Sequence, residues 1–418
     1  MARPDLSPVS FWPTEGLWRH GDFLRLWAAE AGSALGARIT RTALPIIAVL
    51  SIGASPAQVA VLASLGVAPG VVVGLLIGGR VDRGARRPLM IGSDLVRAAL
   101  ILTVPIAAWM GRLGLPQLYL VAGCVGAATT LFRIAHASLL PSLVGPARLV
   151  EGNAKLEGTD SVAEAAGPGV AGALIQILTA PMAMIFTAFT YGWSAWMLSR
   201  IRATEAPRSA TGERAGMVRD IAAGLVASVT HPTVRRLLVA DALASLFGGF
   251  FIALYMILAL RLLALSPAVT GLVISAGGVG AFAGAAIAGD LGRRWGAGRA
   301  MIACLAAGQG ANLFIPLSLH AGPWAIAALL TQQLFGDAFL VAFAIHAVSL
   351  RQRVIEPAVL GRVNATFHVV VGLTLPIGAL AAAPLAGAIG VSATLWVGAV
   401  GSLLAVPALL GSGVWRQR

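Results

Sequence analysis

Twelve long apolar runs occupy most of this sequence. A helix that crosses a membrane needs about 20 mostly apolar residues, and each run is close to that length or longer. Hydrophobic residues fill 58% of the 418 positions, which exceeds their share in typical soluble domains. The sequence therefore predicts an all-α membrane protein with 12 transmembrane helices. The predicted spans are 23–50, 58–79, 88–111, 118–139, 158–178, 181–200, 237–260, 270–289, 300–319, 323–349, 365–388 and 392–413.

Basic residues are distributed unevenly between the predicted loops. With both termini in the cytoplasm, cytoplasmic segments hold 23 of the 30 Lys and Arg residues, and the external loops hold only Arg112 and Arg261. Short cytoplasmic loops of membrane proteins carry such an excess. The net charge of +13 thus indicates topology and an anionic inner leaflet as partner, and it gives no reason to expect nucleic-acid binding. We expect a multi-pass monomer in the bacterial cytoplasmic (plasma) membrane, with both termini cytoplasmic.

A polar segment divides the chain into two similar halves. Residues 201–236 form a predicted cytoplasmic linker, part of which, 212–229, has the mixed polarity of a surface helix. GGRVDRGARRP begins at Gly78, and the related GDLGRRWGAGR begins at Gly289, 211 residues later. This offset is about half the chain and indicates an internal duplication, which is common in transporters. We therefore predict two pseudo-symmetric six-helix bundles, 1–200 and 237–418.

The first of these two motifs resembles the loop signature of the major facilitator superfamily. The matching positions are Gly78, Asp82, Arg83, Arg86 and Arg87, whereas Ala85 replaces the second glycine. The stretch AEAAGPGVAGAL is similar to the fifth-helix signature of exporters in this superfamily, through Gly167, Pro168 and Gly172. FLRLWAAEAGSALG near the start and SLRQRVIEPAVLGRVNAT (349–366) resemble the drug:proton antiporter subgroup of macrolide, multidrug and enterobactin exporters.

The resemblance implies roles for both motifs. Asp82 and the neighbouring arginines are expected to latch the cytoplasmic ends of the two bundles when the cavity faces outward; alternatively, the arginines only fix topology. Pro168 removes a backbone hydrogen bond, and the glycines allow close helix packing, which fits either a special role in preventing leak or ordinary packing.

Charged residues inside the spans are candidate functional residues. A charged side chain at the centre of a spanning helix costs about 2.5–3.5 kcal/mol on insertion scales, so it needs a partner or a wet cavity. Helices 1, 4, 7 and 10 line the cavity in the superfamily that this chain resembles, and they hold most of these charges. The candidates for proton coupling and the substrate cavity are Glu30, Arg38, Arg41, Arg133, Glu164, Asp241, Asp337 and Gln333.

Two interpretations of these charges remain open. Glu30, Arg133 and Glu164 all fall in the cytoplasmic third of their spans, which suggests one charge cluster. A buried acid can exchange a proton when substrate or conformation changes its surroundings. Alternatively, these residues form structural ion pairs. Helix 4 also lacks the Arg-x-x-Gln-Gly pattern of proton-coupled members, which weakens the assignment of Arg133.

The resemblance favours a secondary active transporter that exports drugs or other amphiphilic small molecules in exchange for protons. An importer, or a lipid or siderophore transporter on the same scaffold, is the alternative. We expect no enzymatic activity, because no catalytic constellation is present in the sequence. We also expect no metal, and no cofactor beyond the proton gradient as energy source.

Overall fold

The computed structural model describes residues 16–81, 85–203 and 217–410. In the N-terminal half, the short turn η1 (Leu17–Arg19) precedes six long helices. These are α1 (Gly21–Leu50), α2 (Pro56–Val81), α3 (Arg86–Trp109), α4 (Leu115–Val144), α5 (Leu149–Ile177) and α6 (Ala180–Ser199), with η2 (Pro146–Arg148) before α5.

The C-terminal half is built from helices that are interrupted more often. After α7 (Met217–Thr230), the elements are α8 (Pro232–Ile257) with η3 (Leu258–Leu262), α9 (Pro267–Trp295), α10 (Ala297–Ala311) with α11 (Phe314–Leu317) and η4 (Ser318–His320), η5 (Gly322–Trp324), α12 (Ala325–Thr331) with η6 (Gln332–Gly336) and α13 (Asp337–Val354), α14 (Pro357–Ile389), and α15 (Val391–Ser402) with α16 (Ala405–Leu410). Both η3 and η6 are π-helical turns, which often occur near functional sites.

Local sequence signals fix several helix starts. Proline occupies the first helical position of α8, α9 and α14, where its missing N–H breaks no helical hydrogen bond. The Ser266 hydroxyl accepts a hydrogen bond from the backbone N–H of Val269 at 3.3 Å and thereby caps α9. His20 and His231 cap α1 and α8 in the same way through Nδ1.

The predicted fold class is confirmed. Ten helical stretches of the described chain are long and apolar enough to cross a membrane. The helices α5 and α6 have lower hydropathy, because α5 carries several acids and α6 is rich in Trp, Tyr, Ser and Thr. They nevertheless have 29 and 20 residues, and both pack alongside α1. Together they complete 12 spans in two six-helix bundles. The fifth helix begins at Leu149, earlier than the predicted 158, because its first turns are polar and hydropathy does not register them.

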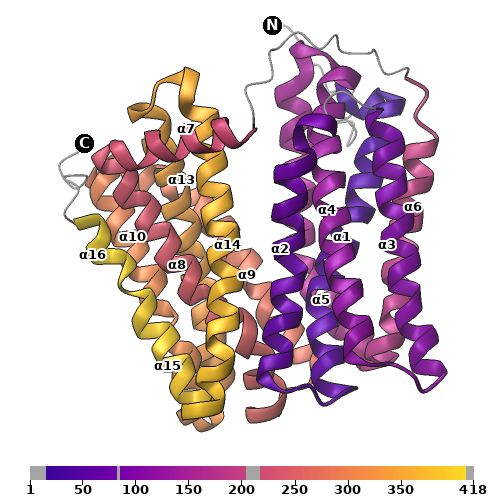
Figure 1. Ribbon diagram of the computed structural model, residues 1–418, viewed down its shortest axis with the longest axis vertical. Coiled ribbons are helices and arrows are strands. Elements are labelled where there is room, and N and C mark those ends of the chain that lie inside the picture. The colour runs from indigo at the N-terminus through magenta and orange to yellow at the C-terminus, as the bar shows by residue number, and fades with distance from the viewer. Residues whose placement is uncertain (1–15, 82–84, 204–216, 411–418) are drawn as a thin grey trace, which may run out of the picture.

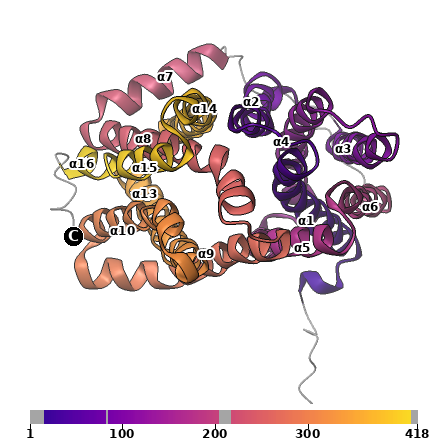
Figure 2. The same cartoon turned by 90° about the horizontal axis from the view of Figure 1, so that it is seen from below.

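The two halves stand side by side, and α7 lies across the helix ends of the C-terminal half (Figure 1). Within the predicted linker, 204–216 lie outside the described residues, and α7 overlaps the predicted surface helix 212–229. We call this side of the molecule the α7 end and the opposite one the distal end. Seen from below, the helices α2 and α5 of the first half face α14 and α9 of the second (Figure 2).

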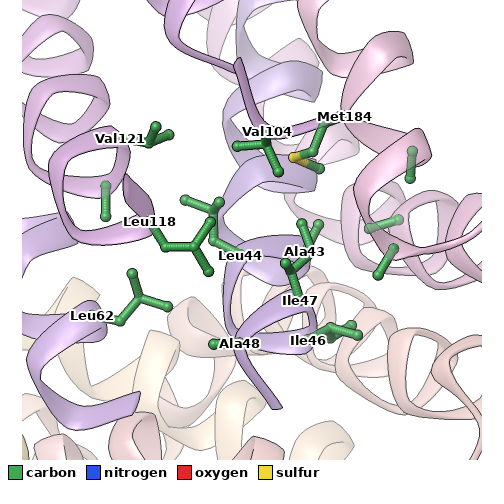
Figure 3. Close-up of a cluster of buried hydrophobic side chains, with 14 of the residues drawn as sticks. Ala43, Leu44, Ile46, Ile47, Ala48, Leu62, Val104, Leu118, Val121 and Met184 are labelled. Carbon is green, nitrogen blue, oxygen red and sulfur yellow. The ribbon is translucent and has the colours of Figure 1, made fainter. Parts of the chain in front are cut away.

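Contacts between the halves lie in the middle and at the distal end of the helices. Arg261 donates to the Val49 carbonyl at 3.1 Å, and Ser64 donates to the Pro376 carbonyl at 3.2 Å. A buried apolar cluster around Leu44, Ile46 and Ile47, part of which Figure 3 shows, also includes residues of η3 and the end of α8. This apolar layer closes the distal end.

Candidate functional site

A network of four charged side chains joins α1 to α5 near the middle of the N-terminal half. Asp160 and Glu164 are separated by one helical turn, so they lie on one face of α5. Arg38 donates to Asp160 at 2.9 Å and also pairs with Glu164, which Arg41 contacts as well. The side chain of Arg41 is 59% exposed and that of Glu164 is 38% exposed, so this network is reachable from outside the protein.

The predicted fifth-helix signature brings α5 against both of its neighbours. Gly167 faces α1, where a Cβ atom would collide with the Cβ of Arg38, so the glycine leaves room for the arginine. Gly172 faces α9 in the other half, and a Cβ there would collide with the Pro267 carbonyl. The reciprocal contact places Gly271 of α9 against the Pro168 carbonyl. The Gly167, Pro168 and Gly172 positions therefore form helix contacts, one within the half and two between the halves.

The crossing of α5 and α9 continues toward the charged network. The backbone N–H of Gly169 donates to the Ser275 hydroxyl at 2.8 Å. One turn further along α9, Gly278 packs directly on Ala165. Glu164 immediately precedes Ala165 in α5, so its carboxylate lies at the edge of the contact between the two halves.

Asp337 lies on the other side of this crossing. Its carboxylate packs against Gly277 of α9, where a Cβ would collide with it, and Gln333 of the π-turn η6 lies beside the same glycine. The buried hydroxyl of Tyr255 on α8, which has no hydrogen-bond partner within the described residues, interacts electrostatically with Asp337. Glu164 also interacts electrostatically with Asp337 from the other half.

No basic side chain forms an ion pair with Asp337 within the part of the chain that the structure describes. Arg38 and Arg41, in contrast, are already paired with two acids. Across the boundary between the halves, an acid without a basic partner in the described chain thus lies within electrostatic reach of a paired acid, an arrangement suited to binding a proton or a cation.

The predicted cluster of Glu30, Arg133 and Glu164 is wrong. Glu30 pairs with His136 of α4 at 3.6 Å, whereas Glu164 pairs with the arginines of α1. Arg133 is exposed and takes part in none of the ion pairs among the described residues. Equal depth in the membrane does not bring side chains together when they point to different faces of their helices, and depth was the basis of that prediction.

Asp241 belongs to a separate group in the C-terminal half. It interacts electrostatically with Arg351 of α13. The guanidinium of Arg351 lies over the Phe367 ring of α14, 4.1 Å from its centroid. Asp241 therefore lies apart from the group at the boundary between the halves, and it forms no ion pair among the described residues.

A fully buried ion pair on α3 was not predicted from the sequence. Asp94 and Arg97 have side chains that are 0% and 1% exposed, and they pair one helical turn apart. Arg97 also donates to the Ser33 hydroxyl at 2.9 Å and to the Thr129 hydroxyl at 3.3 Å. Its guanidinium lies between two rings of α4 and α6, 4.7 Å from the centroid of Phe132 and 4.4 Å from that of Tyr191.

The predicted latch is described only in part. Asp82 and Arg83 lie outside the described residues, and Gly78 lies near the end of α2. Arg86 is buried at the start of α3. Arg87 donates to the carbonyls of Leu198, at 2.7 Å, and Ser199 at the end of α6, where the helix dipole favours a cation. These two hydrogen bonds of Arg87 lie within its own half.

Comparisons with known proteins agree with this architecture. Residues 26–353 match the family described as Major Facilitator Superfamily. An uncharacterized MFS-type transporter of Sinorhizobium fredii, y4rN, is 26% identical over 331 residues, which cover 78% of this chain and 79% of the relative.

Solved structures of low sequence identity share the fold. A mutant of the nucleoside transporter NupG has a TM-score of 0.79 at 11% identity and covers 94% of this chain and 99% of its own. A bacterial homologue of the iron transporter ferroportin, in its inward-facing state, has a TM-score of 0.74 at 20% identity. The match covers 97% of this chain and 100% of the homologue. A structure of such a homologue in its outward-facing state has a TM-score of 0.60 at 18% identity, and the match covers 95% of this chain and 100% of that one.

Proposed function

The chain belongs to the major facilitator superfamily of transporters, and we propose that it exports amphiphilic small molecules in exchange for protons. The observation that carries this proposal is the position of Asp337. Its carboxylate lies at the boundary between the halves, within electrostatic reach of Glu164 and without a basic partner in the described chain. An ionised acid in such a place is costly, so it favours a bound proton or a cationic ligand.

Alternating access would couple this acid to transport. In the conformation described, the distal end is closed and the halves contact each other along α5 and α9. In the proposed cycle, Asp337 accepts a proton from outside when the distal end is open, and this proton displaces the substrate. After the halves rearrange, Asp337 releases the proton on the α7 side, where the next substrate binds. Asp82 and Arg83 are proposed to stabilise the outward-open state.

The export direction rests on the similarity of the fifth helix to exporters of this superfamily, and of FLRLWAAEAGSALG and 349–366 to drug:proton antiporters. The printed names of the structural neighbours mention nucleoside and iron transport, which concerns those proteins. For this chain we propose an amphiphilic substrate, because the boundary combines apolar helix surfaces with a few charges.

The test uses purified protein in liposomes, a lipophilic cationic dye as substrate probe and an imposed pH gradient. We expect Asp337→Asn to abolish gradient-driven dye movement and to leave dye binding measurable, because the amide resembles the protonated acid. Thermal stability should change little, since Asp337 has no ion-pair partner among the described residues; losing a buried partner would cost about 3–5 kcal/mol. Glu356→Gln is the control, because this exposed acid makes no capping hydrogen bond through its side chain at the start of α14.

Three outcomes would contradict the proposal in different ways. Full gradient-driven transport by Asp337→Asn would exclude its coupling role. Lost stability together with lost dye binding would assign Asp337 a structural role. Movement of the dye in the direction of proton flow by the unmodified protein would favour the importer alternative.

A further inference from the structure

A basic cavity lies at the α7 end of the C-terminal half, away from the boundary between the halves. It has a volume of about 340 Å³ and is lined by residues of α9, α10 and α13, three helices that lie together in Figure 2. This volume is at the lower limit of cavities that hold small ligands. The cavity takes no part in the transport cycle proposed above.

Positive groups surround this cavity. Arg293 of α9 and Arg353 of α13 line it, and so does the hydroxyl-bearing Ser349. No acidic residue is among the described residues of its wall. The exposed Asp290 pairs with Arg293 but does not line the cavity. A guanidinium presents several N–H donors in a planar fork, which matches the oxygens of a phosphate group.

The start of α10 adds further donors. Ala297 and Gly298, the first two residues of this 15-residue helix, form part of the wall. Within the described chain no side chain caps this helix, and its first turn holds no acid. Its free N–H groups and a partial charge of about +0.5 therefore favour an anion at this place.

His346 provides an independent indication that the cavity binds a ligand. Its ring lines the cavity. Its Nε2 atom is buried and has no hydrogen-bond partner among the described residues. Gly292 leaves the space that the ring occupies, since a Cβ there would approach His346 to 2.8 Å. A buried polar atom without a partner is costly, and with the ring proton on Nε2 the imidazole would donate a hydrogen bond to an oxygen of a bound anion.

We propose that this cavity binds a phosphate group. Arg293, Arg353, the N-terminus of α10 and His346 would contact its oxygens. The group can belong to the headgroup of an anionic phospholipid, which the positive-inside topology would place at this end of the protein, or to free phosphate.

The experiment uses the full-length protein in a nonionic detergent after removal of bound lipid. The probes are phosphatidylglycerol, phosphatidylcholine and inorganic phosphate, and binding is measured by native mass spectrometry and by the shift in melting temperature. The double variant Arg293→Gln/Arg353→Gln should bind the preferred probe about tenfold more weakly or worse, because two charge-assisted contacts are lost. Arg294→Gln/Arg299→Gln is the control, since it removes the same charge from exposed residues of α9 and α10 that do not line the cavity.

A second variant tests the cavity without changing its charge. Gly289 lines it, and a Cβ there would meet only Arg293, at 3.5 Å, so Gly289→Leu should fold normally and fill the space. We expect it to lose binding as the first double variant does, whereas the control double variant keeps it. Tighter binding of phosphatidylglycerol than of phosphatidylcholine identifies a lipid, and a shift with inorganic phosphate alone identifies free phosphate. Equal losses in both double variants, unimpaired binding in Gly289→Leu, or no binding to the unmodified protein would overturn the proposal.

Discussion

At the residue scale, Arg97 shows how a charge is kept inside the N-terminal half. It is 1% exposed and contacts Asp94, two hydroxyls and two aromatic rings. A buried charge is tolerated only when such partners replace water. The partners come from α1, α3, α4 and α6, so one side chain connects four helices.

Removing Asp94 should therefore destabilise the protein strongly. Asp94→Ala leaves the Arg97 guanidinium buried without its counter-charge, at an expected cost of about 3–5 kcal/mol. Asp290→Ala is the matched control, because Asp290 is also three residues before its partner, Arg293. The side chains of this pair are 55% and 75% exposed, so its loss should lower the free energy of unfolding by only about 0–1 kcal/mol. Thermal unfolding in detergent measures both. Similar small losses in the two variants would show that the buried pair contributes no more than the exposed one.

The sequence predicted the positions of charges better than their partners. Asp160 and Glu164 could be placed on one face of a helix, and the structure pairs both with Arg38. Asp94 and Arg97 carry the same kind of signal, since two opposite charges one turn apart stand in an apolar span. What the sequence could not supply is which neighbouring helix each face meets, and this is why Glu30 was grouped with the wrong residues.

At the element scale, the crossing of α5 and α9 depends on missing side chains. Gly172→Ala should prevent this contact, because the new methyl group would meet the backbone of Pro267 and Ala268, which cannot rotate away as a side chain can. We expect reduced transport and a distal end that is open more often. Spin labels at the exposed Leu178 and Leu262 should report a longer distance.

The control for this change lies on the same helix. Gly158 of α5 has nothing within 4 Å of the position of a Cβ, so Gly158→Ala should leave both transport and the label distance unchanged. An unaltered distance in Gly172→Ala would show that the crossing adjusts to a methyl group, and it would remove the steric explanation for the glycine.

Element positions were predictable because hydropathy follows the membrane thickness. The predicted 23–50, 181–200 and 323–349 differ by only a few residues from α1, α6 and the helical stretch Gly322–Val354. The π-turns η3 and η6 were not predicted, because a π-turn changes the hydrogen-bond register of a helix without changing its hydropathy.

At the scale of the whole molecule, the helix count fixes the relation between the two chain ends. With 12 spans, both ends lie on the same side of the membrane, and the basic residues predict that this side is the cytoplasm. Reporter fusions at Gly212 and after Arg418 should therefore both report a cytoplasmic location. An external location for either fusion would contradict the predicted topology.

The buried contacts of Arg97 have a structural consequence for the N-terminal half. They join α1, α3, α4 and α6, whereas α2 and α5, which pack against the other half, contribute none of the hydrogen bonds or ring contacts described for this side chain. Four helices of this half thus share one buried charge, whereas α2 packs on α4, and α5 is joined to α1 by ion pairs. A substitution at Arg97 should therefore disturb all four of these helices at once, without touching α2 or α5 through the contacts described for its side chain.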